Sequence, residues 1–538
     1  MNHNEVVKRI WQKDATLWKS DPDNIKIINS SLGWLTVADE MIGVIDDLVE
    51  FSESVRSSGF EHVMVCGMGG SSLCPEVLAR TFGRQPGFPE LLVLDSTDPD
   101  VIAAFKDRID IEHCLFIIAS KSGSTTEPNV FQKFWYEEVN KLRDNPGDNF
   151  VAITDPGSPL VETAKDLKFR RTFLNQSDIG GRYSALSYFG MVPAALMGLD
   201  VRRLLEGARQ AAQSNDAAVE LGVTMGDNAA AGRDKLTLVI DRSLETLGLW
   251  IEQLIAESTG KEGTGILPVN GEPLGSPDVY GKDRQFVSIS LGSVSESAQL
   301  EALAAAGHPI VHRELSDLYD LGAEFFVWEF ATAVAGWRLG INPFDQPNVQ
   351  EAKDATKELL TAFTRRGHLD PRNTVASDES ITIYGADDAE KAESVAEVLR
   401  DQLATIKPGD YIAFLNYIEE TPEIDRQFQE LRTQLRDATH CATTVGYGPR
   451  FLHSTGQLHK GGPDTGVFFQ ISANDAIDFA IPGEPYTFAI LKQAQALGDF
   501  RALVKRGRRV IGIDLSDNLL EALAQLRKYL AADPRPSA

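Results

Sequence analysis

The chain has 538 residues, of which 43% are hydrophobic and 24% are charged, as is usual for a globular protein. This length exceeds what one hydrophobic core can organise, so we expect several domains. The chain has 52 Lys and Arg residues and 78 Asp and Glu residues, which gives a formal net charge of −26. Such a surface repels phosphate backbones and anionic lipid, so we predict neither a nucleic acid nor a membrane partner.

The four cysteines form no CxxC pair and show no zinc-ligand spacing. Isolated cysteines of this kind are typical of reduced thiols in the cytoplasm. No stretch approaches the roughly 20 apolar residues that a membrane span requires. We therefore predict a cytoplasmic protein, with no metal and no other cofactor.

Residues 1–55 have the pattern of amphipathic helices. From about residue 60, short apolar runs alternate with helical stretches, which is typical of a parallel sheet covered by helices on both faces. The first series contains HVMVCG, ELLVLDS, CLFIIAS, FVAIT and RRTFLN. The second contains KLTLVID, QFVSISL and PIVHREL, and the third contains SITIYGA, DYIAFLNYI, GVFFQIS and RVIGIDL.

These series predict an α/β protein with two doubly wound parallel-sheet domains and a third α/β domain at the C-terminal end. We place the N-terminal helical segment at residues 1–55 and the domains at 56–215, 216–366 and 367–538. Residues 365–378, RRGHLDPRNTVASD, are predicted to be a polar linker that contains a proline.

One predicted helix has a carboxylate on its apolar face. Leu247, Trp250, Leu254 and Glu257 recur at three- and four-residue spacing, which places them on one side of that helix. A carboxylate in such a position must be paired, protonated or used in chemistry. Taken alone, Glu257 could also be a helix-end residue that reaches solvent or a lysine.

A glycine-rich turn, GMGGSSLCPE, follows the first strand and opens a helix. Gly69, Gly70 and Ser71 would let backbone N–H groups approach an anion at the helix N-terminus. The turn lacks the spacing of the dinucleotide fingerprint and the lysine of a P-loop. A tight turn without a ligand explains it equally well.

A second loop, SKSGSTTEP, follows the strand CLFIIA and also opens a helix. Its hydroxyls, its backbone N–H groups and the helix dipole together suit a phosphate monoester. The alternative is a serine-rich helix cap, but a cap needs only one hydroxyl. The candidate phosphate ligands are Ser120, Lys121, Ser122, Ser124 and Thr125.

The third loop is DIGGRYSALSYFG, in which two glycines precede Arg182. The glycines suggest that the backbone comes close to another group and brings the guanidinium there. A turn that carries a surface arginine in an ion pair is the alternative.

In this order, the three loops and the Glu257 helix resemble the glucose-6-phosphate isomerase family and its sugar-isomerase (SIS) domains. GMGGSSLCPE is similar to the family's GIGGSxLGP, SKSGSTTEP to its phosphate loop, and GGRYS to its GGR-[FY]-S signature. IAESTGKEG resembles the segment with the catalytic glutamate, and INPFDQPNVQEAK the segment with a catalytic lysine. The resemblance covers residues 60–365. The whole chain looks most like the isomerase part of bacterial transaldolase–isomerase fusions, without a transaldolase barrel.

The resemblance implies that the second loop holds the 6-phosphate of the sugar. It implies that Glu257 moves a proton between C2 and C1 through a cis-enediol. Arg182 would stabilise the charge on the enediolate oxygens, and Lys353 would act on the O5 side during ring opening. We also expect Lys121, Arg182, Lys261 and Lys353 to form a local positive focus in this acidic protein.

The chain departs from the family pattern at the ring-opening histidine. Residues 271–291, where the family has it, contain no histidine. A similar string, FLHSTGQLHKGGP, occurs instead at residues 451–463, so His453 or His459 is expected to take the role. Surface or structural histidines are the alternative at both positions.

Two other functions fit the same motifs. One is another sugar-phosphate isomerase on this scaffold, including an enzyme that also acts on mannose 6-phosphate. The other is a non-catalytic sugar-phosphate sensor, which would need the phosphate loop but neither Glu257, Arg182 nor Lys353. A homodimer is one option for the assembly.

Overall fold

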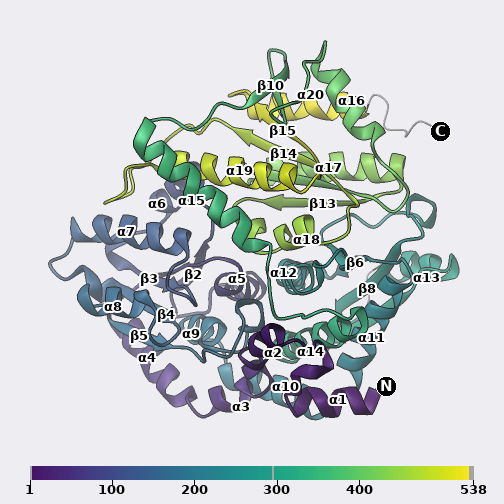
Figure 1. Cartoon of the computed structure of the whole chain (residues 1–538). Coiled ribbons are helices and arrows are strands. Elements are labelled where there is room, and N and C mark those ends of the chain that lie inside the picture. Colours follow the sequence, from purple (N-terminus) through teal and green to yellow (C-terminus); the bar gives the residue numbers. More distant parts are fainter. Residues whose placement is uncertain (1–2, 294–295, 532–538) are drawn as a thin grey trace.

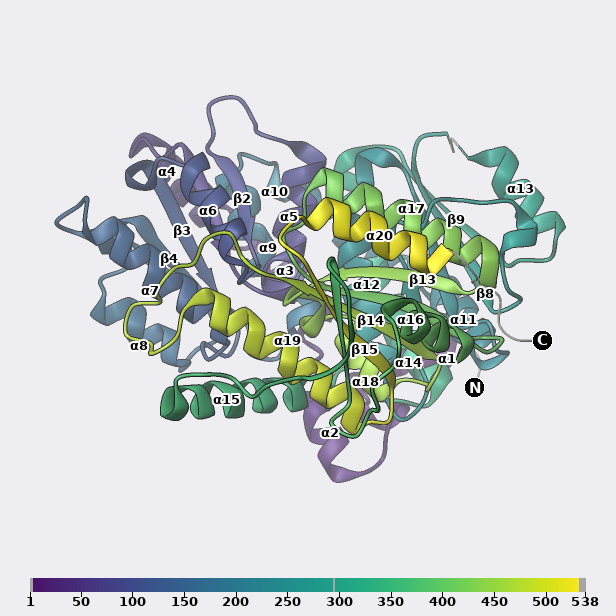
Figure 2. The ribbon, with the colours of Figure 1, turned by 90° about the horizontal axis from the view of Figure 1, so that it is seen from above.

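The computed structural model describes residues 3–293 and 296–531. It contains three sheets with helices packed against them, as Figures 1 and 2 show from two directions. The prediction of an α/β fold with parallel sheets is confirmed. The domain boundaries proposed from the sequence remain predictions.

The first sheet is parallel, in the order β2-β1-β3-β4-β5. Its strands are the five apolar runs predicted between residues 60 and 176. They are β1 (His62–Cys66), β2 (Glu90–Leu94), β3 (Cys114–Ala119), β4 (Phe150–Thr154) and β5 (Arg171–Leu174). The helices of this layer are α4 (Ile45–Ser57), α5 (Leu73–Phe82), α6 (Pro99–Arg108), α7 (Thr126–Asn140), α8 (Pro159–Asp166) and α9 (Tyr188–Leu196).

The second sheet is also parallel, in the order β7-β6-β8-β9. Its strands are β6 (Lys235–Ile240), β7 (Leu267–Val269), β8 (Arg284–Leu291) and β9 (Ile310–Leu315). The helices are α10 (Val201–Gln213), α11 (Asp216–Ala230), α12 (Leu247–Thr259), α13 (Ser297–Ala305) and α14 (Leu321–Leu339). The three-residue strand β7 was not predicted, because it is too short to show a periodic pattern.

The third sheet is mixed, in the order β10-β11-β15-β14-β12-β13, with antiparallel pairs at β10–β11 and β11–β15. Its strands are β10 (Asn373–Ser377), β11 (Ile381–Gly385), β12 (Tyr411–Tyr417), β13 (Ala442–Tyr447), β14 (Gly466–Ala473) and β15 (Arg509–Leu515). The helices are α15 (Val349–Arg366), α16 (Val395–Ala404), α17 (Pro422–Thr439), α18 (Gly456–Gly461), α19 (Phe488–Lys505) and α20 (Leu519–Ala531). The expectation that residues 365–378 form only a linker is wrong, because β10 lies there and pairs with β11.

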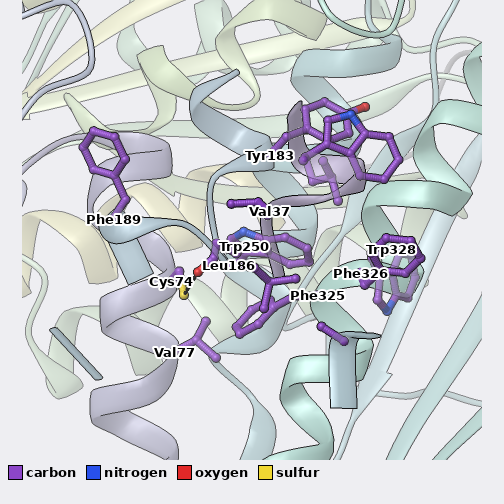
Figure 3. Packing of buried hydrophobic residues seen from close by; sticks show 14 of the residues in the cluster. Val37, Cys74, Val77, Tyr183, Leu186, Phe189, Trp250, Phe325, Phe326 and Trp328 are labelled. Atoms are coloured by element: carbon purple, nitrogen blue, oxygen red, sulfur yellow. Dashed lines mark hydrogen bonds between the residues drawn. The ribbon is translucent and has the colours of Figure 1, made fainter. Parts of the chain in front are cut away.

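The N-terminal helices α1 (His3–Trp11), α2 (Pro22–Asn29) and α3 (Val37–Ile42) pack against the first two layers. Trp11 stacks on Phe326 of α14, and Trp34 lies 5.4 Å from Tyr183, measured between ring centroids. Figure 3 shows part of this core, in which Trp250 of α12 meets the ring of Phe325 edge-on at 4.8 Å. Trp250 thus anchors the helix of Glu257 in this core.

Two helices of the third layer pack into the core of the first layer. Helices α15 and α19 lie side by side in both views (Figures 1 and 2). Gly498 permits their close approach, since a Cβ there would lie 2.9 Å from Thr356 Oγ1. Among the residues that the structure describes, no helix is long and apolar enough to cross a membrane.

Candidate active site

Glu257 and Arg182 form a buried ion pair. Helix α12 carries Glu257 in its last turn, and the one-turn helix η6 (Gly181–Tyr183) carries Arg182. Arg182 Nη1 donates to Glu257 Oε1 at 3.0 Å, and Gln253 Nε2 donates to Glu257 Oε2 at 3.1 Å. A hydrogen bond therefore holds each carboxylate oxygen of Glu257 in place.

The Arg182 guanidinium uses all five of its N–H donors on protein acceptors. Besides Glu257, Nη1 reaches Gln346 Oε1 at 2.9 Å, and Nε reaches Ser258 Oγ at 2.7 Å. Nη2 donates to the backbone oxygens of Pro343 at 2.7 Å and Asp345 at 3.0 Å. The positive charge is thus held in one orientation, and a substrate oxygen can accept a hydrogen bond from it only by replacing one of these acceptors.

The glycine-rich turn packs against the Arg182 loop. A Cβ on Gly70 would lie 1.9 Å from the backbone oxygen of Gly181, so only glycine fits there. Gly69 has φ of +53°, and a Cβ there would lie 2.5 Å from Gln253 Nε2. Ser71 is buried in the same turn. Close backbone packing is therefore enough to explain why glycines stand at positions 69 and 70. That Gly69, Gly70 and Ser71 bind the substrate remains a prediction.

The predicted phosphate loop borders a cavity of about 770 Å³. Ser122, Ser124 and Thr125 line it, and Thr125 is the residue before α7, whose N-terminus adds its dipole. Ser120 lies beneath them and donates from Oγ to Thr125 Oγ1 at 3.2 Å. Lys121 lies outside the lining, because its Nζ contacts Asp155 Oδ2 at 2.6 Å and the backbone oxygen of Ser177 at 3.0 Å.

Helix α15 and the third layer form the rest of this cavity. Lys353 lines it, and its ammonium makes no hydrogen bond or ion pair with any residue that the structure describes. His453 also lines it, from the one-turn helix η10 (Arg450–His453). The structure therefore brings together residues predicted from three distant parts of the chain.

His453 forms a pair with Glu127, a residue that we did not predict as part of the site. His453 Nε2 lies 3.2 Å from Glu127 Oε1, and Gln495 Nε2 donates to the same oxygen at 2.7 Å. Burial acts to raise the pKa of Glu127, but the charge and hydrogen bond of His453, a backbone hydrogen bond and the charge of Lys353 together bring the pKa below its usual value. An ionised carboxylate only accepts hydrogen bonds, so His453 Nε2 carries a proton.

His459 does not lie at the cavity. Its ring is buried between those of Tyr411 and Phe468, and Nδ1 lies 2.8 Å from Tyr411 Oη. Burial moves the pKa of His459 far below its ordinary value. Because α18 begins at Gly456, the chain turns between the two histidines and carries only His453 to the cavity.

Gln253 links the ion pair to the cavity. Its Nε2 donates both to Glu257 Oε2 and, at 2.8 Å, to the backbone oxygen of His453. Neither Glu257 nor Arg182 lines the cavity. The Gln253 side chain therefore lies between the Glu257–Arg182 pair and His453, which does line it.

Lys261 is a second buried cation beside Arg182. Its Nζ donates to Asn342 O at 2.9 Å and to Asp345 Oδ1 at 2.6 Å. Burial, reinforced by the charge of Arg182, lowers the pKa of Lys261 to about 8. Of the four cations expected to form one positive focus, Lys121 is thus tied to Asp155 and Lys261 to Asp345, while Lys353 lies in the cavity.

Within residues 3–293 and 296–531, one cluster of carboxylates could in geometry hold a metal ion: Asp98, Asp100 and Asp475. Lys492 Nζ already contacts Asp98 Oδ2 at 2.9 Å and also pairs with Asp475, so a lysine supplies the positive charge there. The cluster is not part of the cavity lining.

Comparison with known proteins finds relatives of one family. The family model for phosphoglucose isomerase matches residues 32–266. The glucose-6-phosphate isomerase of Rubrobacter xylanophilus is 31% identical over 368 residues, which are 57% of this chain and 84% of that protein. The enzyme of the same name from Campylobacter jejuni is 26% identical over 389 residues, or 63% of this chain and 94% of the relative.

Two solved structures have a similar fold. A hypothetical protein of Thermus thermophilus, TT0462, matches with a TM-score of 0.56 and 24% identity, over 66% of this chain and 94% of its own. A glucose-6-phosphate isomerase from Chlamydia trachomatis matches with a TM-score of 0.51 and 21% identity, over 67% of this chain and 78% of its own. At these identities the two matches show the fold alone.

Proposed function

We propose that this chain, which belongs to the glucose-6-phosphate isomerase family, interconverts glucose 6-phosphate and fructose 6-phosphate with Glu257 as the base. The observation that carries the proposal is the Gln253 link between the Glu257–Arg182 pair and a cavity lined by His453, Lys353 and the predicted phosphate loop (residues 120–125, called the hydroxyl loop below). A hexose 6-phosphate needs all of these groups: ligands for a dianion, an acid and a base for ring opening, and a carboxylate for proton transfer.

The hydroxyl loop is the proposed site for the phosphate. Ser122, Ser124 and Thr125 offer hydroxyl donors at the N-terminus of α7, where the helix dipole favours an anion. Lys353, which lines the same cavity, adds a positive charge. Anchoring the phosphate in this way fixes the carbon chain relative to the catalytic groups.

Ring opening is assigned to the His453–Glu127 pair and Lys353. Because Nε2–H of His453 is held against Glu127, Nδ1 is the atom left to exchange a proton with the sugar hydroxyl. The ammonium of Lys353 would donate a proton or hydrogen bond to the ring oxygen, O5, as the C1–O5 or C2–O5 bond breaks. The product of this step is the open-chain sugar.

Glu257 then carries out the isomerisation. Its carboxylate removes the proton from C2 of the open-chain aldose and returns it to C1, so that one base suffices in both directions. Negative charge that develops on the oxygens of C1 and C2 meets the Arg182 guanidinium, which is already oriented. All required residues come from one chain, so a homodimer would add none that this scheme needs.

The decisive experiment measures conversion of fructose 6-phosphate to glucose 6-phosphate in a dehydrogenase-coupled assay. Glu257→Gln keeps the size of the side chain and removes the base, so we expect kcat to fall by at least about a thousandfold. An inactive wild-type protein that still binds a sugar phosphate would favour a sensor or an isomerase for another sugar. Activity that survives in Glu257→Gln would show that the base lies elsewhere.

The same assay with mannose 6-phosphate tests dual specificity. We further propose a cytoplasmic location, supported by four cysteines that are all free and buried. The strongly negative net charge supports the absence of a nucleic acid partner. Sedimentation of the purified protein would determine its oligomeric state, and constant specific activity on dilution would support a site that is complete in one chain.

A further inference from the structure

The loop after β2 joins the first layer to the third through two side chains. Asp95 accepts two hydrogen bonds from Arg450, at 2.9 Å from Nε and 3.0 Å from Nη2. Thr97 Oγ1 donates to Gln495 Oε1 at 2.7 Å. Two residues of one short loop thus contact both η10 and α19, which carry His453 and the Gln495 partner of Glu127.

Each of these two contacts reaches a neighbour of the His453–Glu127 pair. Arg450 begins the one-turn helix that ends at His453, so the bidentate bond to Asp95 fixes the position of this helix. Gln495 donates to the Glu127 oxygen that also faces His453. The loop after β2 therefore positions the His453 imidazole through Arg450 and the Glu127 carboxylate through Gln495.

We propose that Asp95 and Thr97 are positioning residues for ring opening, and that they act through Arg450 and Gln495 on His453 and Glu127. This inference rests on the proposed function. It gives the third layer a specific part in the reaction, because this layer supplies the ring-opening histidine. The loop after β2 then keeps His453 at hydrogen-bonding distance from Glu127.

The role of Thr97 follows from the direction of its hydrogen bond. The hydroxyl donates to the Gln495 carbonyl oxygen, so the amide NH₂ must face Glu127. Thr97, Gln495 and Glu127 are almost completely buried, and water cannot easily replace a lost partner. Without the hydroxyl, Gln495 Oε1 loses its buried donor, and the Glu127 carboxylate alone holds the amide in place.

A pair of matched variants tests this. Thr97→Val keeps the shape and removes the hydroxyl, whereas Thr97→Ser keeps the hydroxyl. We expect Thr97→Val to lower kcat for glucose 6-phosphate roughly tenfold, the kinetic equivalent of one lost hydrogen bond, and Thr97→Ser to stay within about threefold of wild type. Thr332→Val is the control, because this buried hydroxyl donates only to a backbone oxygen in its own helix, that of Trp328.

Ring opening is observed separately by NMR, as the exchange rate between the α and β anomers of glucose 6-phosphate. In a Glu257→Gln background, which blocks proton transfer, adding Thr97→Val should slow this exchange about tenfold. Affinity for a linear phosphohydroxamate that mimics the enediol should stay within about twofold. A parallel loss of that affinity, or no change in kcat and exchange, would overturn the inference.

The second arm uses Asp95 and does not depend on the folding of the Thr97 variants. Asp95→Asn should slow anomer exchange about tenfold, while Glu420→Gln should not, although Glu420 also contacts Arg450, at 3.4 Å on the exposed side. Equal rates in the two variants would contradict the inference. If wild type lacks isomerase activity, the proposed function fails instead; if wild type is active and Thr97→Val and Asp95→Asn are normal, only this inference fails.

Discussion

His453 Nε2 and Glu127 Oε1 lie 3.2 Å apart, although 326 residues separate them along the chain. The carboxylate comes from the first turn of α7 in the first layer, and the imidazole comes from η10 in the third layer. Their distance therefore depends on the packing of two layers and not on local structure. A reaction that needs both groups is sensitive to that packing.

The first prediction concerns His453. His453→Ala should lower kcat for glucose 6-phosphate by about a hundredfold or more, because it removes the general acid–base group of ring opening. The rate of exchange between the anomers of glucose 6-phosphate, measured by NMR in the Glu257→Gln background, should fall by a similar factor. Binding of the linear phosphohydroxamate should change less than about threefold. The control is His312→Asn, an exposed histidine on β9, and equal losses in both variants would count against the assignment.

Much of the fold was predictable from the chain. Buried parallel strands such as β1 and β3 are nearly continuous apolar runs, so they stand out from the amphipathic helices around them. Strands β10 and β13, NTVAS and ATTVGY, lack such runs because part of each is accessible to solvent or polar. Their place in the sheet is decided by pairing with β11 and β12, which no local pattern records.

The candidate site was predictable only where a motif carries the chemistry. The hydroxyl loop, Arg182 and Glu257 stand in short recognisable segments. Glu127 carries no such signal, because a glutamate in the first turn of a helix is usually a solvent-exposed partner of the dipole. Its burial by His453 and Gln495 is a tertiary effect. Similarly, only the turn before α18 distinguishes His453 from His459.

The second prediction concerns Arg182. Arg182→Lys keeps the charge but cannot reach the five acceptors that the guanidinium contacts in one plane. We expect kcat to fall about a hundred- to a thousandfold, since the fixed charge at the enediolate is displaced. The matched control is Arg203→Lys, which alters an exposed pair with Asp317. Activity within about threefold of wild type in Arg182→Lys would exclude the proposed role.

The third prediction concerns Lys353. Lys353→Met removes a cation that lines the cavity, so kcat should drop about a hundredfold and KM for the phosphorylated sugar should rise. Lys528→Met removes an exposed charge on α20 and should leave both constants within about twofold. The comparison separates a local effect from the general effect of net charge. Equal changes in the two variants would contradict a positive group dedicated to the substrate.

The fourth prediction concerns the stability contributed by Lys261. Its pKa is lowered to about 8 by burial and then by Arg182, below its ordinary value of 10.5. Below pH 8 the ammonium is charged in both the folded and the unfolded chain, and the cost of burying it is fully present. Between pH 8 and 10.5 the unfolded chain binds more protons at this residue, so its contribution to the free energy of unfolding rises with pH.

Urea unfolding of wild type and Lys261→Met at several pH values tests this linkage. From pH 7.5 to 10.5, the free energy of unfolding of wild type should rise by about 3 kcal/mol relative to the variant. Comparison with the variant cancels the titration of the other groups, which both proteins share. Lys528→Met should run parallel to wild type over the same range, because its side chain is exposed. A constant difference between wild type and Lys261→Met would mean that this lysine titrates alike in the folded and unfolded chain.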